Sequence, residues 1–401
     1  MNILFACHRV PFPPNRGGKI RPFHMLRHLA QRHSVVLVSL AESDSELRDS
    51  ASLTELCADV AVEVVPRRVR WAQAWRALPT GTPSSVAYFR SARLHRQVQR
   101  LLASRTFDVV VVHCAFAAPY VRTVSCRTRL LDFGDLDSGK WFDYSRCRPL
   151  PLSLGYRLEA GKLRRFEQQW AARFDRCTVT TTGELQEYQS LGVAVDGTVI
   201  PNGVTASFFD VDPHPRLDSG VLAFLGRMDY FPNIDGVLHF VRHILPHVRA
   251  QVPNVQLRVI GANPTPRILD LARLPGITVT GSVPDVRPYL RDVAVSIAPL
   301  RIARGTQNKI LESMAMGIPV VATPVAAKGV QATPGTHLLV APDPGAFARH
   351  VIDLLRDPQQ RETLSAAGRR QVAEAHDWTR SMTILDRVLD DVHSTERLPG
   401  G

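Results

Sequence analysis

Features that would mark a membrane-spanning or exported protein are missing from this sequence. No uncharged apolar run reaches about 18 residues, so we expect no membrane-spanning helix. The opening stretch MNILFACHRVPFPP lacks a basic region and a small-residue cleavage site, so we interpret it as a first strand and not as an export signal. The six cysteines include no C-x-x-C pair, which argues against a zinc site and favours reduced, mostly buried thiols in a cytoplasmic protein.

Positive charge is in excess. The chain has 49 Lys and Arg against 37 Asp and Glu, a net charge of +12, and such an excess favours an anionic partner. The charge alone does not choose among nucleic acid, a membrane surface and a phosphorylated substrate. Because no RNA- or DNA-binding signature accompanies it and the arginines are scattered, we expect no nucleic-acid partner.

The length of 401 residues predicts two domains, since single domains cluster near about 100–150 residues. Runs of β-branched residues alternate with helical patterns, which indicates strands buried on both faces of a parallel sheet. Two successive series of such runs predict an α/β fold with two doubly wound domains. The expected strands cover 2–7, 34–40, 60–65, 108–113, 130–133 and 177–181 in the first series, and 221–225, 255–260, 277–280, 293–298, 319–322 and 338–340 in the second.

A segment rich in Pro, Asp and Gly, residues 197–220, separates the two series and predicts the domain boundary. The expected first domain is 1–200 and the second is 201–376. A further helix is expected over 377–395, and we expect it to cross back and pack on the first domain.

A loop with a ligand-binding pattern follows the first strand of each domain. In the first domain, Gly17 and Gly18 precede a helix expected over 20–31, where backbone without Cβ atoms and a helix N-terminus favour a bound anion. In the second, Gly226 ends the strand and Arg227 projects from its carboxyl end, where a guanidinium can hold a diphosphate. The alternatives are a tight turn without a ligand and an exposed loop arginine.

The most specific motif is GTQNKILESMAMGIPVVAT, which begins at Gly305. A loop ends at Gly305 and Thr306, and a helix is expected over 307–316. Asn308 and Glu312 share one helix face, and Lys309 lies next to them. Backbone N–H groups and the ammonium suit phosphate, and a carboxylate one turn deeper suits ribose hydroxyls. The alternative, a solvated Lys–Glu pair, would contribute only about 0.2–0.5 kcal/mol and leaves the glycine-rich loop unexplained.

Six segments together match the pattern of one enzyme family. They are the opening strand with its Gly-Gly loop, VIPNGV from Val199, GRMDY from Gly226, VIGANP from Val259, VTGSVPDVRPYL from Val279 and KILESMAMGIPVVAT from Lys309. In these segments the chain resembles the family 4 retaining glycosyltransferases, whose GT-B fold has two Rossmann-like domains facing a cleft. The segments DFGDLDSGKW and MDYFPNIDGVLHFV resemble the sugar transferases of exopolysaccharide and exosortase (PEP-CTERM) export clusters.

The resemblance implies roles for individual residues. Glu312 would bind the donor ribose, Arg227 the diphosphate, and Gly18 would lie beside the donor phosphates. Many members have a second glutamate eight positions earlier, where this chain has Arg304, so the donor sugar is left open, an acidic sugar included. Many also have a lysine shortly after the GR motif, whereas here the sequence reads FPN. We expect Lys309 to supply that phosphate-binding charge.

The acceptor side is expected in the first domain. His113 ends a strand where relatives often carry a histidine, and its near-neutral intrinsic pKa suits proton traffic or a hydroxyl contact. Asp135 and Asp137 follow the next strand, and Lys140 and Trp141 lie just beyond them. The alternatives are a structural histidine, a turn-forming Asp pair and ordinary packing.

Two basic amphipathic segments, 66–78 and 89–105, lie in the first domain. Trp71, Trp75 and Leu78 fall on one helical face of the first segment, a pattern that suits a helix lying on an anionic membrane. The alternative is a surface helix whose apolar stripe packs on the sheet. A membrane would suit a polyprenyl-linked acceptor.

These observations predict a cytoplasmic hexosyltransferase, peripheral to the inner membrane surface, that uses a nucleoside-diphosphate sugar and no further cofactor. The second domain would bind the donor and the first a glycan or polyprenyl-linked acceptor. The predicted catalytic residues are Arg227, Lys309 and His113, and the resemblance implies retention of anomeric configuration. No metal site is expected, although Asp135-Leu136-Asp137 has the D-x-D spacing.

Two other functions remain open from the sequence. A sugar-nucleotide 2-epimerase has the same architecture but needs paired acid/base carboxylates and no acceptor. A non-catalytic two-lobed binding protein would hold a small molecule between its domains. Product formation that depends on an acceptor distinguishes a transferase from the epimerase. Any turnover at all distinguishes a transferase from the binding protein.

Overall fold

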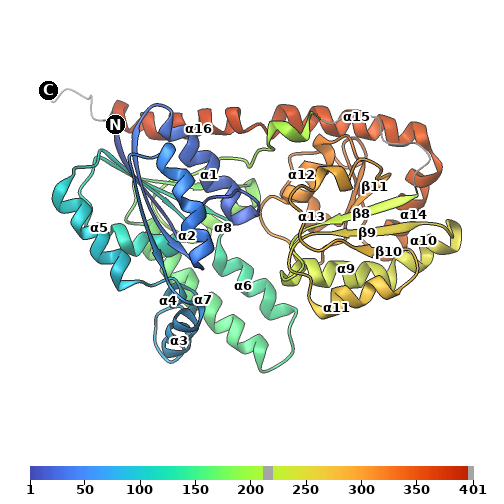
Figure 1. The fold of residues 1–401 in the computed structure, drawn as a ribbon, viewed down its shortest axis with the longest axis horizontal. Coiled ribbons are helices and arrows are strands. Elements are labelled where there is room, and N and C mark those ends of the chain that lie inside the picture. The colour runs from blue at the N-terminus through green and yellow to red at the C-terminus, as the bar shows by residue number, and fades with distance from the viewer. Residues whose placement is uncertain (211–219, 396–401) are drawn as a thin grey trace. The chain divides into compact units, whose positions relative to one another are not determined.

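The computed structural model describes residues 1–210 and 220–395, with side chains described up to residue 390. The chain divides into two compact units, Met1–Ile200 with the segment from Met382 onward, and Pro201–Ser381. Residues 211–219 of the predicted boundary segment lie outside the described residues. Each unit contains one parallel sheet flanked by helices (Figure 1), which confirms the predicted pair of Rossmann-like domains.

The first unit has a seven-stranded sheet in the order β3-β2-β1-β4-β5-β6-β7. The order reverses between β1 and β4, and ligands bind at such switch points in open parallel sheets. Its strands are β1 (Asn2–Cys7), β2 (Ser34–Ala41), β3 (Asp59–Val64), β4 (Val109–His113), β5 (Thr128–Gly134), β6 (Arg176–Val179) and β7 (Gly197–Val199). The last of these, an edge strand, lies in the segment where we predicted only a boundary.

The helices of the first unit follow from the amphipathic patterns between these strands. Their bounds are α1 (Gly17–Ala30), α2 (Asp44–Ser50), α3 (Arg67–Ala77), α4 (Ser84–Tyr88), α5 (Ala92–Ser104), α6 (Asp137–Arg146), α7 (Leu152–Ala171) and α8 (Thr182–Gln189). The final helix α16 (Trp378–Thr395) begins in the second unit and, from Met382, belongs to the first, where Asp386 pairs with His28 of α1 at 2.8 Å.

The second unit has a six-stranded sheet in the order β10-β9-β8-β11-β12-β13. Its switch point lies between β8 and β11, which pair in parallel through Val295 with Leu222 and Ser296 with Ala223. The strands are β8 (Val221–Leu225), β9 (Gln256–Ile260), β10 (Ile277–Val279), β11 (Val295–Ala298), β12 (Val320–Ala322) and β13 (Leu339–Val340).

The helical sequence pattern of residues 235–249 predicts a single helix, which is wrong, because the structure has two helices in this region. They are α9 (Phe231–His243) and α10 (Leu245–Gln251), and Pro246 in the first turn of α10 explains the break because proline donates no backbone N–H. The other helices of the unit are α11 (Pro266–Leu269), α12 (Asn308–Ala315), α13 (Pro324–Ala327), α14 (Pro344–Arg356) and α15 (Pro358–Ala375).

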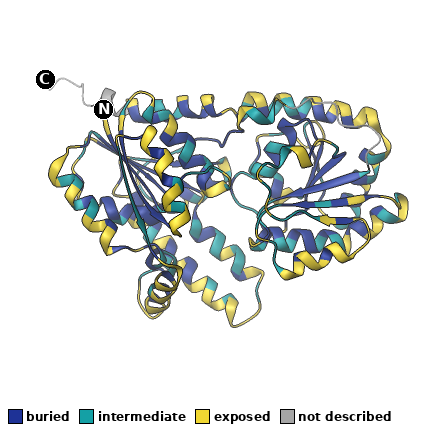
Figure 2. Cartoon of the chain, viewed as in Figure 1, coloured by how far each residue is buried: buried dark blue, intermediate teal, exposed yellow. Residues whose placement is uncertain are grey.

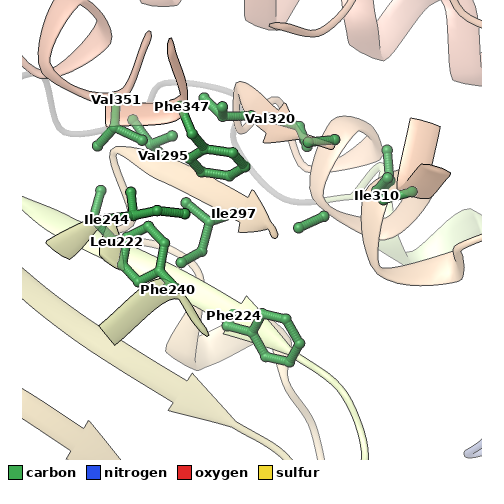
Figure 3. Packing of buried hydrophobic residues seen from close by; sticks show 14 of the residues in the cluster. Leu222, Phe224, Phe240, Ile244, Val295, Ile297, Ile310, Val320, Phe347 and Val351 are labelled. Carbon is green, nitrogen blue, oxygen red and sulfur yellow. The ribbon is translucent and has the colours of Figure 1, made fainter. Parts of the chain in front are cut away.

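Each sheet is the centre of its unit's apolar core, and Figure 2 shows both sheets as mostly buried. In the second unit, side chains of α9 and α14 pack on β8 and β11, with Phe240 and Phe347 in edge contact at 6.0 Å between ring centroids (Figure 3). Phe224 and Ile310 are fully buried in the same cluster. This core fixes the carboxyl ends of β8 and β11 and the start of α12.

Candidate functional site

The candidate donor residues of the second unit gather near the switch point of its sheet. Gly226 and Arg227 follow β8, and the loop 299–307 follows β11 and leads into α12. Open parallel sheets bind ligands at this place because two neighbouring loops diverge there. The sequence placed these segments at strand ends, and the strand order brings them together.

Two glycines let backbone segments approach one another at the end of β8. Gly226 and Gly261 have φ values of 153° and 149°, a region that favours glycine. A Cβ at Gly261 would lie 1.8 Å from the Gly226 carbonyl oxygen, and a Cβ at Gly226 would lie 2.6 Å from Nδ2 of Asn233. The glycines therefore seat Asn233, a buried residue of α9 that the sequence patterns did not single out.

Lys309 is held by Asn233. Its ammonium donates to Oδ1 of Asn233 at 2.6 Å, and Nδ2 of Asn233 donates to the Arg227 carbonyl at 2.9 Å. The ammonium also lies over the Phe224 ring, 5.0 Å from its centroid. Burial lowers the pKa of Lys309 to about 7, against the opposing effect of the Glu312 carboxylate. The Lys309 ammonium is desolvated in the folded protein, and an anionic ligand would stabilise its charged form.

Glu312 lies one turn further along α12 and is partly buried. Burial raises its pKa to about 7, although the Lys309 ammonium acts in the opposite direction. Among the described residues no hydrogen bond or ion pair holds the Glu312 carboxylate, so the solvated Lys–Glu pair considered as the alternative does not form. The carboxylate is therefore free to accept bonds from ligand hydroxyls.

The loop before α12 is shaped by a second pair of glycines. Gly305 has a φ of 57°, and a Cβ at Gly329 would lie 1.9 Å from the Gly305 carbonyl oxygen. After this turn, Oγ1 of Thr306 and Oδ1 of Asn308 are buried without a hydrogen-bond partner in the structure. No side chain caps α12 at its N-terminus. Buried polar atoms are nearly always hydrogen-bonded, so both oxygens are able to bond to the polar groups of a ligand.

Arg227 forms a bidentate pair with Asp229, through Nε at 3.0 Å and Nη2 at 2.6 Å. Oδ2 of Asp229 also accepts from Asn263 at 3.2 Å. The arginine side chain is 34% exposed, so its guanidinium is oriented by the carboxylate and still reachable.

The predicted glycines of the first unit lie in the helix and not before it. Gly17 and Gly18 form the first turn of α1, which begins three residues earlier than we predicted. Nothing lies within 4 Å of a Cβ built at either position, so no protein contact requires glycine there. No side chain caps this N-terminus, which leaves its backbone N–H groups open to an anion.

His113 is positioned by a buried hydrogen-bond network. Its Nδ1 lies 2.7 Å from Oδ2 of Asp132, whose other oxygen accepts from Thr178 at 2.7 Å and from Arg21 at 2.6 Å. Burial opposes ionisation of Asp132, but the Arg21 guanidinium holds the pKa of this carboxyl well below its usual range. Asp132 and Arg21 were missed from the sequence, where the only signal was an acid within an apolar strand.

His8 lies beside His113 at the switch point of the first sheet. It follows β1, the two rings stack with centroids 6.2 Å apart, and Nδ1 of His8 is buried without a partner. Burial lowers the pKa of His8 well below its usual value, so its ring is neutral. No sequence pattern singled out this residue.

The other acceptor-side candidates surround the start of α6. Asp135 accepts from Thr180 Oγ1 at 2.6 Å, and Asp137 lies 3.8 Å from the Lys140 ammonium. Glu167 of α7 accepts the backbone N–H of Ser138 at 3.1 Å, and burial raises its pKa to about 8. Trp141 packs against Tyr156 at 5.3 Å between ring centroids, which fits the packing alternative.

The two basic amphipathic segments differ in the structure. In α5 the apolar residues Leu94 and Val98 are buried in the sheet core, as the packing alternative predicts. In α3 the apolar stripe is exposed, with Trp71, Trp75 and Leu78 at 48%, 68% and 51% of their full exposure. The packing alternative is therefore wrong for α3.

The described residues also bear on metal binding and on membrane-spanning helices. Within 1–210 and 220–395, no group of three or more His, Cys, Asp or Glu side chains is arranged to hold a metal ion. No helix in the same residues has the length and apolar character needed to cross a bilayer.

Family comparisons match both halves of the chain. Residues 16–203 match the family described as "Glycosyl transferase 4-like domain", and residues 219–357 match "Glycosyl transferases group 1". A relative, phosphatidyl-myo-inositol mannosyltransferase of Mycobacterium leprae (strain TN), is 28% identical over 330 residues, which span 80% of this chain and 83% of the relative.

Solved structures share the fold. Sucrose-phosphate synthase from Thermosynechococcus elongatus has a TM-score of 0.71 at 17% identity, covering 98% of this chain and 100% of that one. HepE of Anabaena in complex with UDP-glucose has a TM-score of 0.67 at 15% identity, with the same coverage. At these identities the likeness shows the fold alone.

Proposed function

On these matches the chain is a glycosyltransferase of the GT-B type, and we propose that it transfers a hexosyl group from a nucleoside-diphosphate sugar to a glycan or polyprenyl-linked glycan. The observation that carries the donor class is the set of unsatisfied groups at α12. Lys309 is an ammonium held in a partly buried place, and Thr306 and Asn308 have buried oxygens without partners. A diphosphate with a ribose would satisfy them.

The donor is oriented by groups of the second unit. The diphosphate lies against Arg227, Lys309 and the N-terminus of α12, and Glu312 accepts from the ribose hydroxyls. Burial disfavours the protonated form of Lys309, and a bound anion favours it. The donor diphosphate therefore raises the pKa of Lys309 and keeps its ammonium protonated. UDP-glucose, the ligand of the HepE complex, is a nucleoside-diphosphate sugar of this class.

The reaction proceeds with retention of anomeric configuration and without a metal ion. The bond between the anomeric carbon and the phosphate oxygen breaks while the acceptor oxygen bonds to the same face of that carbon. The acceptor's proton passes to the departing phosphate oxygen. Arg227, Lys309 and the α12 amides stabilise the negative charge that develops on the diphosphate, the role for which fixed donors in a site are most effective. His113 of the first unit contacts the acceptor.

Thermal unfolding with UDP, GDP, ADP, CMP and TDP tests the donor site. At about 100 times the Kd, a ligand stabilises by about 2.7 kcal/mol, a shift of several degrees. We expect one nucleotide to shift the wild type and to lose its effect in Glu312→Ala and in Arg227→Ala. The matched controls are the exposed residues Glu374 and Arg242, whose alanine variants keep the shift. No shift with any nucleotide at millimolar concentration contradicts the proposal.

Transfer itself is tested by the release of nucleotide from the matching sugar donor. Release that depends on an added glycan or polyprenyl-phosphate glycan agrees with a transferase. Interconversion of the donor without an acceptor indicates the epimerase, and binding without turnover indicates the two-lobed binding protein.

We further propose that the first unit docks on an anionic membrane through α3 and the amino-terminal half of α7. The two helices are joined where Lys162 of α7 donates to the Leu78 carbonyl at 2.8 Å. Leu154 and Leu158 of α7 are 55% and 61% exposed, and Trp75 of α3 is 68% exposed. No acidic residue lies within 66–88. Exposed apolar side chains among arginines suit insertion between anionic headgroups.

Vesicle co-sedimentation tests this surface. We expect binding to vesicles that contain phosphatidylglycerol and weak binding to pure phosphatidylcholine, with the first reduced at least about tenfold in the double variant Trp75→Ser, Leu158→Ser. The control variant Leu269→Ser, Leu274→Ser changes two exposed leucines of the second unit and keeps the binding. Equal binding by both variants contradicts the proposed surface.

A further inference from the structure

Asp132 has an unusual place for a charged residue. It lies inside β5 with none of its surface exposed, and its register partner on β4 is His113. Its carboxylate accepts two bonds from Arg21 Nε, at 3.1 and 2.9 Å, and one from Nη2 at 2.6 Å. Thr178 of β6 donates its hydroxyl to the same carboxylate at 2.7 Å. Three elements therefore fix this carboxylate beside the histidine.

The network determines which nitrogen of His113 carries the proton. The Arg21 guanidinium keeps the pKa of Asp132 well below its usual range against the effect of burial, so Asp132 is an ionised, acceptor-only group. Nδ1 of His113, 2.7 Å from Oδ2, must then be the donor. In the neutral ring the lone pair is on Nε2, and among the described residues no group bonds to that atom.

The backbone around His113 is also shaped for this position. Cys114 directly after it has a φ of 68°, a conformation that costs free energy in a residue other than glycine and is often kept at functional sites. Gly134 has a φ of 66°, and a Cβ there would lie 3.5 Å from Cε1 of His113. The neutral ring of His8 stacks on the imidazole, with the ring centroids 6.2 Å apart. The imidazole is therefore held on several sides and left open at Nε2.

We propose that Asp132 is a positioning residue, which holds His113 in the tautomer protonated on Nδ1 so that Nε2 accepts a hydrogen bond from an acceptor hydroxyl next to the one that reacts. This bond orients the acceptor, and the reacting hydroxyl keeps its own proton until that proton passes to the departing phosphate oxygen. The tautomer is a property of the first unit alone. Only its use in transfer rests on the proposed function.

The tautomer is tested by NMR on protein labelled with ¹⁵N-histidine. The His113 signals are identified by their loss in His113→Gln. At pH 8 we expect the wild type to show a protonated Nδ1 and an unprotonated Nε2. In Asp132→Asn we expect the opposite tautomer, because the amide donates where the carboxylate accepted. A wild-type His113 protonated on Nε2 overturns the proposal, and this outcome is readable even if the variant does not fold.

Kinetics test the use of this tautomer. We expect kcat to fall about 10²-fold in Asp132→Asn, because a misplaced acceptor hydroxyl reacts more slowly, with the donor KM unchanged. The double variant with His113→Gln should be no slower than His113→Gln alone, because both changes remove one interaction. Multiplied effects in the double variant would mean that Asp132 acts independently of His113, which overturns the positioning role.

A matched control separates stability from positioning. Asp175 accepts the backbone N–H of Arg129 at 2.7 Å in the same unit, away from His113. Its asparagine variant should keep both kcat and the His113 tautomer. If the wild type shows no transfer with any donor, the proposed function fails, and the NMR result still decides whether Asp132 sets the tautomer.

Discussion

Replacing Lys309 with methionine should stabilise the ligand-free protein while weakening the binding of nucleotide. Methionine keeps the length and apolar stem of the side chain and removes the charge. In the folded protein burial lowers the pKa of Lys309 from its ordinary 10.5 to about 7. At 1.36 kcal/mol per pH unit this is at most about 5 kcal/mol, and partial exposure of the side chain reduces it to about 2–3 kcal/mol.

The gain in the free energy of unfolding of Lys309→Met should decrease as the pH rises. The unfolded chain holds the Lys309 proton up to about pH 10.5, whereas the folded protein releases it near pH 7. The destabilisation is therefore absent above pH 10.5, grows as the pH falls to about 7, and is complete below that. Lys309→Met should be more stable than wild type by about 2–3 kcal/mol at pH 6 and by about 1 kcal/mol at pH 9.5.

Hydrogen–deuterium exchange in increasing urea measures this, because peptides from β8 and β12 report on the second unit alone. The matched control is Lys328→Met, a change at an exposed lysine of the same unit, which should leave stability within about 0.5 kcal/mol. Lys309→Met should also lose the thermal shift given by the donor nucleotide. A variant less stable than wild type at pH 6, or a gain equal at both pH values, would refute the assignment of Lys309 as a desolvated cation.

Two further predictions concern single positions. Gly261→Ala places a Cβ 1.8 Å from the Gly226 carbonyl oxygen at a φ of 149°, so thermal unfolding should show a loss of at least about 3 kcal/mol, whereas Gly161→Ala, in open space on α7, should gain about 0.5–1 kcal/mol. Glu167→Gln should be more stable than wild type by about 1–4 kcal/mol at pH 8.5 and equal to it near pH 4.5 in urea titrations. The pKa of Glu167 is raised to about 8, so its ionisation destabilises the fold as the pH rises. Equal stability at pH 8.5 would contradict this.

Local patterns in the sequence predicted every strand of the described residues except β7, and they predicted the most specific motif. Continuous valines predicted β4, because a strand buried on both faces has no polar side to show. The helix α12 was expected over 307–316 and covers Asn308–Ala315, since Gly317 with a φ of 71° ends it. The resemblance to the family motifs, which are also local patterns, predicted Glu312 and Arg227 as donor-binding residues. The start of α1 was misplaced and the break before α10 was not predicted, since glycine and proline positions alone do not locate helix ends within a few residues.

Strand order and long-range contacts were decided by the tertiary structure alone. Asn233 meets Lys309 from 76 positions away, and Arg21 meets Asp132 from 111. Neither pairing leaves a periodicity or spacing in the sequence, because each depends on which strands become neighbours at the switch points. A hydrogen bond requires about 3 Å and a defined angle, and only the packed sheets fix both. The sequence by itself thus determined which residues are chemically able to act, and the packing of the two sheets determined which of them meet.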